Sequence, residues 1–411
     1  MIHPGEPSLK RSLSLPLLTL YGLGTILGAG IYVLIGEVAG NAGMRAPLAF
    51  LAAGVVAGFT GFSYAELSSR IPRSAGEAAY AGRAFRSRLP ALGAGLGVVL
   101  TGIVSAATIA NGFVGYLREF LPAHRELTIV VTVLCLGSLA AWGVTESVIA
   151  AAVVTALEVL GIGLVLALTG SALGDFPARA VEFAPRLEWP QWTGLITAAY
   201  LAFFAFIGFE DIVNMAEETK RPERTLPRAI LLSLGISTAL YMLVATVAVL
   251  AMPPAEIARA EAPFAALLAR HGKLATTTIS LISLVAVING ALIQVMMAAR
   301  VLYGMAAQGL APRPFAAVHP VRRTPLLATG VVTAAVLLLA TALPLVSLAA
   351  ATSTVTLLVF ALMNASLLRI KMTADSPPAG SFHVPAAVPG IGLLLCLAAL
   401  ALQGALRAGW L

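Results

Sequence analysis

Six glycines interrupt an apolar stretch of the chain, Leu20–Gly40, which reads LYGLGTILGAGIYVLIGEVAG. A membrane-spanning helix needs roughly 20 apolar residues, so this stretch is long enough to cross a bilayer. An interior glycine costs a helix about 1 kcal/mol relative to alanine, yet Gly28, Ala29 and Gly30 lie near its middle. The glycines predict either a broken helix, whose free peptide groups form half of a binding site, or a continuous helix with small residues for close packing.

Two acidic residues lie in other apolar stretches. Glu158 has apolar neighbours on both sides in GVTESVIAAAVVTALEV, and Glu210 follows Gly208 in LAFFAFIGFEDIVNMAEE. A carboxylate at the centre of a spanning helix costs about 2.5–3.5 kcal/mol on insertion scales, so such residues are candidates for function. The sequence has no GKS or GKT phosphate loop, no metal-spaced His/Cys/Asp cluster and no G-x-S-x-G elbow. We therefore expect no enzyme, no cofactor and no ATP-driven pump.

The elements that hold these residues are predicted to be membrane helices. Hydrophobic residues make up 59% of the chain and charged residues 11%, against about 25% charged in soluble domains. The net charge of +7 comes from basic residues scattered between apolar spans, which excludes a nucleic-acid surface. We expect one membrane domain over residues 1–411, in contact with the lipid bilayer.

Apolar windows predict about eleven transmembrane helices. With the N-terminus inside, 17 of the 26 Lys and Arg residues fall in inner segments and 9 in outer ones. The excess of basic residues marks the cytoplasmic side, so we expect a cell (inner) membrane protein with a cytoplasmic N-terminus and an outer C-terminus. The predicted spans are 13–39, 46–69, 91–117, 127–142, 148–170, 192–216, 228–252, 275–303, 325–343, 346–369 and 387–408.

The two interrupted stretches resemble each other. Pro47 opens the helix after the first stretch and Pro227 the helix after the second, 17 and 19 residues beyond Gly30 and Gly208. Five spans separate the two breaks, so the copies would run in opposite directions across the membrane, as in many secondary transporters. The pattern predicts a first five-helix repeat over 13–170, an inverted second repeat over 191–371 and an additional helix over 385–408.

Four segments resemble the amino acid–polyamine–organocation permease family. The resemblance covers nearly the whole chain and implies an all-α integral membrane fold, with a five-plus-five inverted-repeat (LeuT-like) transporter core and discontinuous helices 1 and 6. The segments are GTILGAGIY (24–32), YAELSSRIPRSAGEAAYA (64–81), FAFIGFEDIVNMAEETKRPERTLPRAI (204–230) and RVLYGMAAQGLAPRPFAAVHPVRRTP (300–325).

The resemblance also implies where an amino acid substrate would bind. A helix N-terminus offers free N–H groups to a carboxylate, and a helix C-terminus offers free C=O groups to an ammonium. Either Phe204 or Phe206 is expected to close the site from outside as a gate, and lipid-facing or core packing is the alternative for both. The expected substrate contacts are the amides of Gly28, Ala29 and Gly30 and the carbonyls of Ile26, Phe204 and Ile207.

The chain departs from the family pattern at two informative positions. Glu77 replaces the second glycine of the inner-loop pair, and Glu158 stands where many proton-coupled members have lysine. We expect Glu158 to carry the coupling proton; the alternative is a fixed strut, protonated and hydrogen-bonded to a helix 1 carbonyl. Glu210 is expected either to sense pH or, as the favoured reading, to hold the inner half of helix 6 in place.

These features predict a secondary transporter that imports a neutral amino acid by alternating access, with protons as the coupling ion. Sodium coupling is disfavoured because helix 8 shows no suitable Ser/Thr pair beside helix 1. Three alternatives stay open: exchange of one amino compound for another, a polyamine substrate, and an amino-acid sensor that does not transport. The oligomeric state is not predicted.

Overall fold

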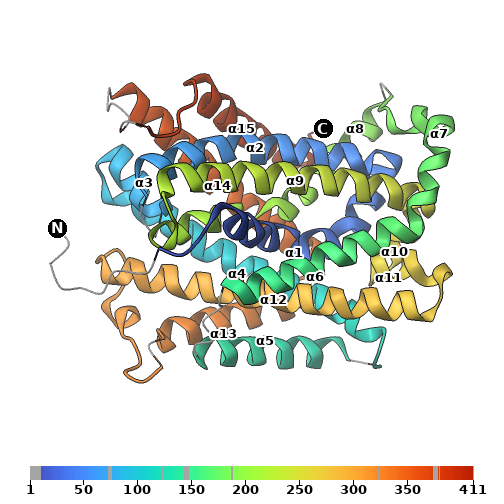
Figure 1. Ribbon diagram of the computed structural model, residues 1–411, viewed down its shortest axis with the longest axis horizontal. Coiled ribbons are helices and arrows are strands. Elements are labelled where there is room, and N and C mark those ends of the chain that lie inside the picture. Colours follow the sequence, from blue (N-terminus) through green and yellow to red (C-terminus); the bar gives the residue numbers. More distant parts are fainter. Residues whose placement is uncertain are drawn as a thin grey trace.

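A computed structural model describes residues 11–72, 76–122, 124–142, 148–186, 188–322, 324–373, 378 and 380–410. Long helices lie side by side through the molecule, and shorter helices lie at both ends of the bundle (Figure 1). Within the described residues the regular structure is helical, with no strands. This agrees with the all-α fold class expected from composition.

Eleven helical segments of the described chain coincide with the eleven predicted spans. Nine windows are long and apolar enough to cross a membrane, and Leu15–Gly28 and Leu326–Ala342 are shorter apolar helices. The predicted edges are right to within a few residues because span length follows from hydropathy. The segments are α1 (Leu15–Ala42), α2 (Ala46–Arg70), α4 (Arg88–Arg118), α5 (Arg125–Trp142), α6 (Val148–Thr169), α8 (Trp189–Ala202) continued by η3 (Phe203–Phe206) and η4 (Phe209–Glu218), α9 (Pro222–Ala251), α12 (Lys273–Ala307), α13 (Leu326–Ala342), α14 (Leu345–Met372) and α15 (Ala387–Arg407).

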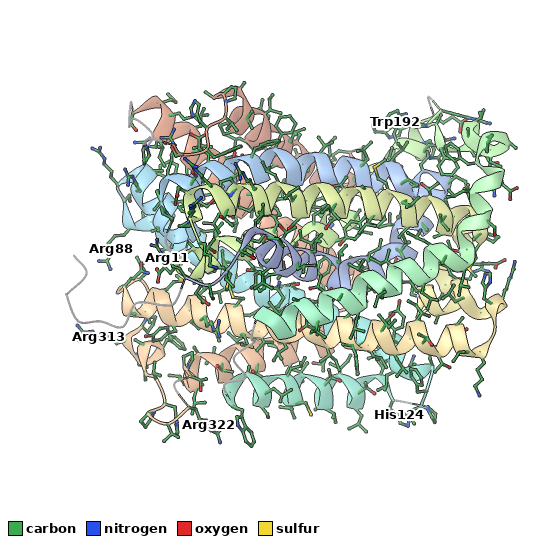
Figure 2. All side chains as sticks on the ribbon, in the orientation of Figure 1. Arg11, Arg88, His124, Trp192, Arg313 and Arg322 are labelled. Carbon is green, nitrogen blue, oxygen red and sulfur yellow. The ribbon has the colours of Figure 1, made fainter. Side chains whose placement is uncertain are left out.

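Shorter elements cover the ends of the bundle. One of them, α3 (Gly76–Phe85), lies near the N-terminus (Figure 1). Arg11, Arg88, Arg313 and Arg322 lie at this same end, which we call the N-terminal end, whereas His124 and Trp192 lie at the opposite end (Figure 2). The remaining short elements are η1 (Gly43–Arg45), η2 (Gly170–Asp175), α7 (Phe176–Phe183), α10 (Pro254–Arg259), α11 (Pro263–Leu268), η5 (Ala269–His271) and η6 (Arg313–Ala316).

Two spans lose their helical geometry near the middle. In α1, Gly28 has φ −35° and ψ −114°, so the helix is kinked there. In the sixth span, the chain is extended at Ile207 (φ −68°, ψ 136°) and Gly208 has φ +121°. The left-handed φ of Gly208 favours glycine, which has no Cβ. Helices 1 and 6 are therefore discontinuous, as predicted for a LeuT-like core.

Small residues bring the other helices close together. α2 packs along α9, and α4 packs along α12 and α14, while α1 contacts α6, α9 and α12. A Cβ added to Gly61 of α2 would lie 2.3 Å from a Leu234 methyl on α9, and one added to Gly102 of α4 would lie 2.9 Å from the Ala298 Cβ on α12. Close helix contact through small residues is typical of membrane bundles. The packed helices hold the broken segments of α1 and the sixth span at the centre.

Candidate functional site

The two helix breaks touch each other. The Thr25 hydroxyl donates to the Gly208 carbonyl at 2.9 Å and lies 3.0 Å from the Gly22 carbonyl. A Cβ at Gly30 would lie 2.4 Å from the Ala205 Cα, well inside the usual contact distance of about 3.5–4.0 Å between carbons. Glycine at position 30 is therefore needed for α1 to approach the sixth span this closely.

Tyr241 of α9 joins the two breaks from the side. Its hydroxyl lies 2.6 Å from the Ile26 carbonyl and 2.8 Å from the Ala205 carbonyl, and its side chain is fully buried. Both carbonyls lie beside a break, where unwinding leaves C=O groups without their helical partner. Sequence reasoning missed Tyr241, because α9 carries several serine and threonine hydroxyls as well and nothing in the sequence distinguishes the tyrosine hydroxyl from them.

A cavity lies between the breaks and two scaffold helices. In this conformation its volume is about 20 Å³, which is room for about one water molecule, so the lining side chains would have to move apart to admit an amino acid. Four predicted substrate residues line it: Ile26, Gly30, Phe204 and Ile207. The other lining residues are Thr25 of α1, Ser105 and Ile109 of α4, and Gly290, Ile293 and Gln294 of α12.

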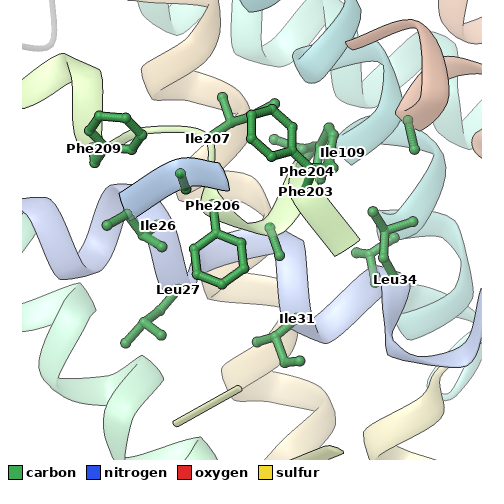
Figure 3. Packing of buried hydrophobic residues seen from close by; sticks show 14 of the residues in the cluster. Ile26, Leu27, Ile31, Leu34, Ile109, Phe203, Phe204, Phe206, Ile207 and Phe209 are labelled. Atoms are coloured by element: carbon green, nitrogen blue, oxygen red, sulfur yellow. The ribbon is translucent and has the colours of Figure 1, made fainter. Parts of the chain in front are cut away.

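The two predicted gate residues point in different directions. Phe204 lies beside Ile109 and Ile207, at the cavity, whereas Phe206 points away toward α1 residues on the other side (Figure 3). The Phe206 ring packs against Tyr241 at 5.2 Å between ring centroids, edge to face, and is fully buried. Only Phe204 of the pair lines the cavity, so Phe206 takes the core-packing role. The backbone of Gly28 forms the α1 break, and Gly28 is not among the described residues that line the cavity.

Sequence reasoning missed the contribution of α4 and α12. Gln294 is a polar side chain within an apolar span, which is a signal for function. Ser105, Ile109, Gly290 and Ile293 carry no comparable signal, because small and apolar residues are common throughout both helices. Only the packing of α4 and α12 around the breaks shows that these residues face the cavity.

Glu158 lies on α6 beside the α1 break. A Cβ at Gly28 would be 3.8 Å from Glu158 Oε1, and the Glu158 side chain is fully buried. The Tyr32 hydroxyl donates to the Glu158 main-chain carbonyl at 2.6 Å, but neither carboxyl oxygen has a hydrogen-bond partner among the described residues. The hydrogen bond to a helix 1 carbonyl, which a fixed strut would require, is not formed in this conformation.

Glu210 caps the break in the sixth span. Its Oε2 accepts a hydrogen bond from the Gly208 main-chain N–H at 2.8 Å. This contact holds the start of η4 against the break, as the structural alternative for Glu210 requires. Glu210 also lines a second cavity, with a volume of about 20 Å³, together with Tyr64, Thr101, Asp211 and Gln294.

Comparison with known proteins identifies relatives along nearly the whole chain. Residues 13–406 match the family model described as "Amino acid permease". The chain is 30% identical to the branched-chain amino acid permease BcaP of Bacillus subtilis (strain 168), covering 96% of this chain and 88% of that protein. It is 32% identical to an uncharacterized transporter of Mycobacterium tuberculosis (strain ATCC 25618 / H37Rv), over 95% and 85% of the two chains. It is 29% identical to cationic amino acid transporter 4 of Mus musculus, over 91% of this chain and 62% of that longer protein.

Proposed function

Because the chain belongs to the amino acid permease family, we propose that it imports a neutral amino acid by alternating access, coupled to protons. The observation that carries this proposal is the contact between the two helix breaks, beside a cavity that both of them line. We place it in the cell (inner) membrane with a cytoplasmic N-terminus, and we retain 13–170 and 191–371 as its inverted repeats.

The breaks supply complementary groups for a zwitterion. The second half of α1 begins at the break, so the amides of Gly28, Ala29 and Gly30 can receive a carboxylate at a helix N-terminus. The carbonyls of Ile26, Phe204 and Ile207 can accept from an ammonium group. Ile26 already accepts from Tyr241, but a carbonyl oxygen has two lone pairs and can accept a second hydrogen bond. This arrangement binds both charges of an amino acid without a charged side chain.

The cavity walls favour a substrate with an apolar side chain. Five of the ten described lining residues are isoleucine or phenylalanine (Ile26, Ile109, Phe204, Ile207 and Ile293), and none of the ten is charged. Burying a charged substrate side chain there would leave it without a partner, which costs several kcal/mol. The name of the Bacillus subtilis relative, a branched-chain amino acid permease, supports the same substrate class.

A cationic amino acid is the second candidate, and one feature favours it. Glu210 and Asp211 line the second cavity, and Gln294 lines both cavities. A long cationic side chain that displaced Gln294 would reach these two acids. The names of several relatives, including that of the mouse protein, specify cationic amino acids.

Glu158 is the residue we propose for carrying the coupling proton. Its carboxyl group is buried next to Gly28 and has no hydrogen-bond partner in the part of the chain that the structure describes, so protonation would not have to break a contact seen there. A proton bound there changes the charge beside the α1 break, where the substrate carboxylate is expected. Binding of proton and substrate would thereby be linked.

Uptake by proteoliposomes tests the function and the substrate class together. The panel should include leucine, valine, alanine, lysine, arginine, glutamate and putrescine, each with and without an inward proton gradient. We expect leucine or valine to accumulate with the gradient; accumulation of lysine or arginine instead would select the cationic candidate. Exchange without net uptake would select an exchanger, and binding without any movement would select a sensor.

Glu158→Gln tests the proton carrier. A gradient of one pH unit is about 1.4 kcal/mol and supports up to about tenfold accumulation for one coupled proton. The variant should lose this accumulation and keep exchange at equal pH. Glu126→Gln, at the exposed start of α5, makes the same change away from the site and should behave as wild type. Full gradient-driven accumulation by Glu158→Gln would exclude Glu158 from coupling.

A further inference from the structure

A second cavity lies next to the substrate cavity and contains acids that the proposed uptake of a neutral amino acid does not use. Tyr64 of α2 and Glu210 and Asp211 of η4 line it. Gln294 is the one described residue that lines both cavities. The second cavity therefore lies directly beyond the substrate site, on the side of the inner half of the sixth span.

Glu77 lies behind the Tyr64 wall of this cavity. The Tyr64 hydroxyl donates to Glu77 Oε1 at 3.3 Å, and the Glu77 side chain is only 4% exposed. Glu77 is also the residue that departs from the glycine pair of the family motif. It belongs to the first turn of α3, a short helix at the N-terminal end of the bundle whose Arg83 is exposed to solvent (Figure 1).

Burial raises the pKa of the Glu77 carboxyl from its ordinary value of 4.5 to about 7. The carboxyl is thus able to gain and lose a proton near neutral pH. Tyr80, on the same helix, is buried, and its hydroxyl has no hydrogen-bond partner within the described ranges. No described basic side chain forms an ion pair with Glu77. The other charged groups on the surrounding elements are Glu210, Asp211, Glu217 and Glu218 on η4, Arg83 on α3, Arg88 and Arg118 on α4, Arg369 and Lys371 on α14, and Arg70 and Glu66 on α2, where Glu66 forms ion pairs with both Arg70 and Lys371.

We propose that Glu77 releases the coupled proton at the N-terminal end of the bundle, after receiving it through the Tyr64 hydroxyl from Glu210, which takes up the proton after it leaves Glu158, the proposed carrier. This inference rests on the proposed proton-coupled function. The proton of a protonated Glu210 passes to the Tyr64 oxygen as the Tyr64 hydroxyl proton passes to the Glu77 carboxylate. Glu210 ends ionised, Tyr64 stays neutral and Glu77 ends protonated, so the proton count is conserved. Glu77 then loses its proton to water.

The geometry supports each end of this route. Tyr64 and Glu210 line one cavity, so the first transfer crosses a space that both side chains face. The second transfer follows the existing hydrogen bond from Tyr64 to Glu77. A tyrosine hydroxyl can donate and accept at once, which a relay between two carboxyl groups requires. Glu77 could instead only stabilise the start of α3 as an acidic first-turn residue, and the test must separate these two roles.

The test uses the full chain in proteoliposomes whose lumen faces the N-terminal end. Two assays are run: leucine exchange at equal pH on both sides, and leucine uptake at a fixed outer pH with the lumen pH varied from 6 to 8. Both compare wild type with Glu77→Gln, Glu77→Asp and Tyr64→Phe. Glu223→Gln, in the first turn of α9 at the same end, is the matched control. Wild-type uptake should fall as the lumen becomes more acidic than about pH 7, because proton release from Glu77 then slows.

Glu77→Gln should keep leucine exchange and lose the response of uptake to lumen pH. It should also lose gradient-driven accumulation, which a gradient of one pH unit supports up to about tenfold in the wild type. Glu77→Asp should restore part of the accumulation and part of the response to lumen pH. Tyr64→Phe should lower accumulation without moving the midpoint of the response to lumen pH. A Glu77→Gln protein that keeps the wild-type response to lumen pH would overturn the proposal, as would parallel loss of exchange and accumulation, which indicates a structural role. A wild type that exchanges leucine but ignores pH gradients would overturn proton coupling and this route. A wild type that moves no amino acid would overturn the proposed function itself.

Discussion

Gly30→Ala tests the close contact between the two helix breaks. The new Cβ would lie 2.4 Å from the Ala205 Cα and 2.8 Å from the Ala205 Cβ. Carbon atoms in contact prefer about 3.5–4.0 Å, so the breaks must separate by about 1 Å. The atoms that must move belong to backbone or are directly attached to it, and they have no rotamer that avoids the clash.

The expected cost follows from this geometry. Overpacking of a well-packed core costs about 1–3 kcal/mol, so the variant should unfold at lower temperature than wild type. The shift also moves one wall of the cavity, since Gly30 and Phe204 both line it. Misplacement by about 1 Å can reduce activity up to about 100-fold when geometry is decisive. We therefore expect substrate uptake to fall at least tenfold.

Gly58→Ala is the matched control. Gly58 lies within α2, and a Cβ added there meets nothing within 4 Å. The same substitution should therefore leave uptake unchanged and stabilise the helix by up to about 1 kcal/mol. Initial uptake rates in proteoliposomes and thermal unfolding in detergent would measure both effects. Wild-type uptake by Gly30→Ala would refute the direct contact of the breaks as the basis of the site.

Two further predictions concern buried polar groups. Tyr241→Phe removes the hydroxyl that lies between the Ile26 and Ala205 carbonyls at the two breaks. The variant should have a free energy of unfolding lower by about 1–3 kcal/mol and should bind leucine more weakly. An unchanged affinity for leucine in a binding assay would contradict this prediction. Burial raises the pKa of Glu77 from 4.5 to about 7, so the folded chain binds that proton more tightly than the unfolded chain. The Glu77 contribution to stability therefore falls as pH rises from 4.5 to about 7, and the wild-type melting temperature should decline over this window more steeply than that of Glu77→Gln. Parallel curves would contradict the prediction.

The sequence by itself determined the properties that depend on local chemistry. Span positions follow from hydropathy, because a helix must satisfy its own backbone groups in lipid. The glycines marked where Leu20–Gly40 could break but left a continuous helix possible; the resemblance to the permease family implied breaks in helices 1 and 6, and the structure confirms them at Gly28 and Gly208. The position of Glu158 in the apolar part of its span is likewise readable from its neighbours along the chain.

Only the tertiary structure decided which side chains meet. Phe204 and Phe206 are two residues apart and equally apolar, yet one lines the cavity and the other packs on Tyr241. Gln294 and Glu77 come from distant segments, and their places beside the two cavities follow from how α12 and α3 pack. These contacts depend on the relative rotation and distance of whole helices, which no local pattern of residues specifies.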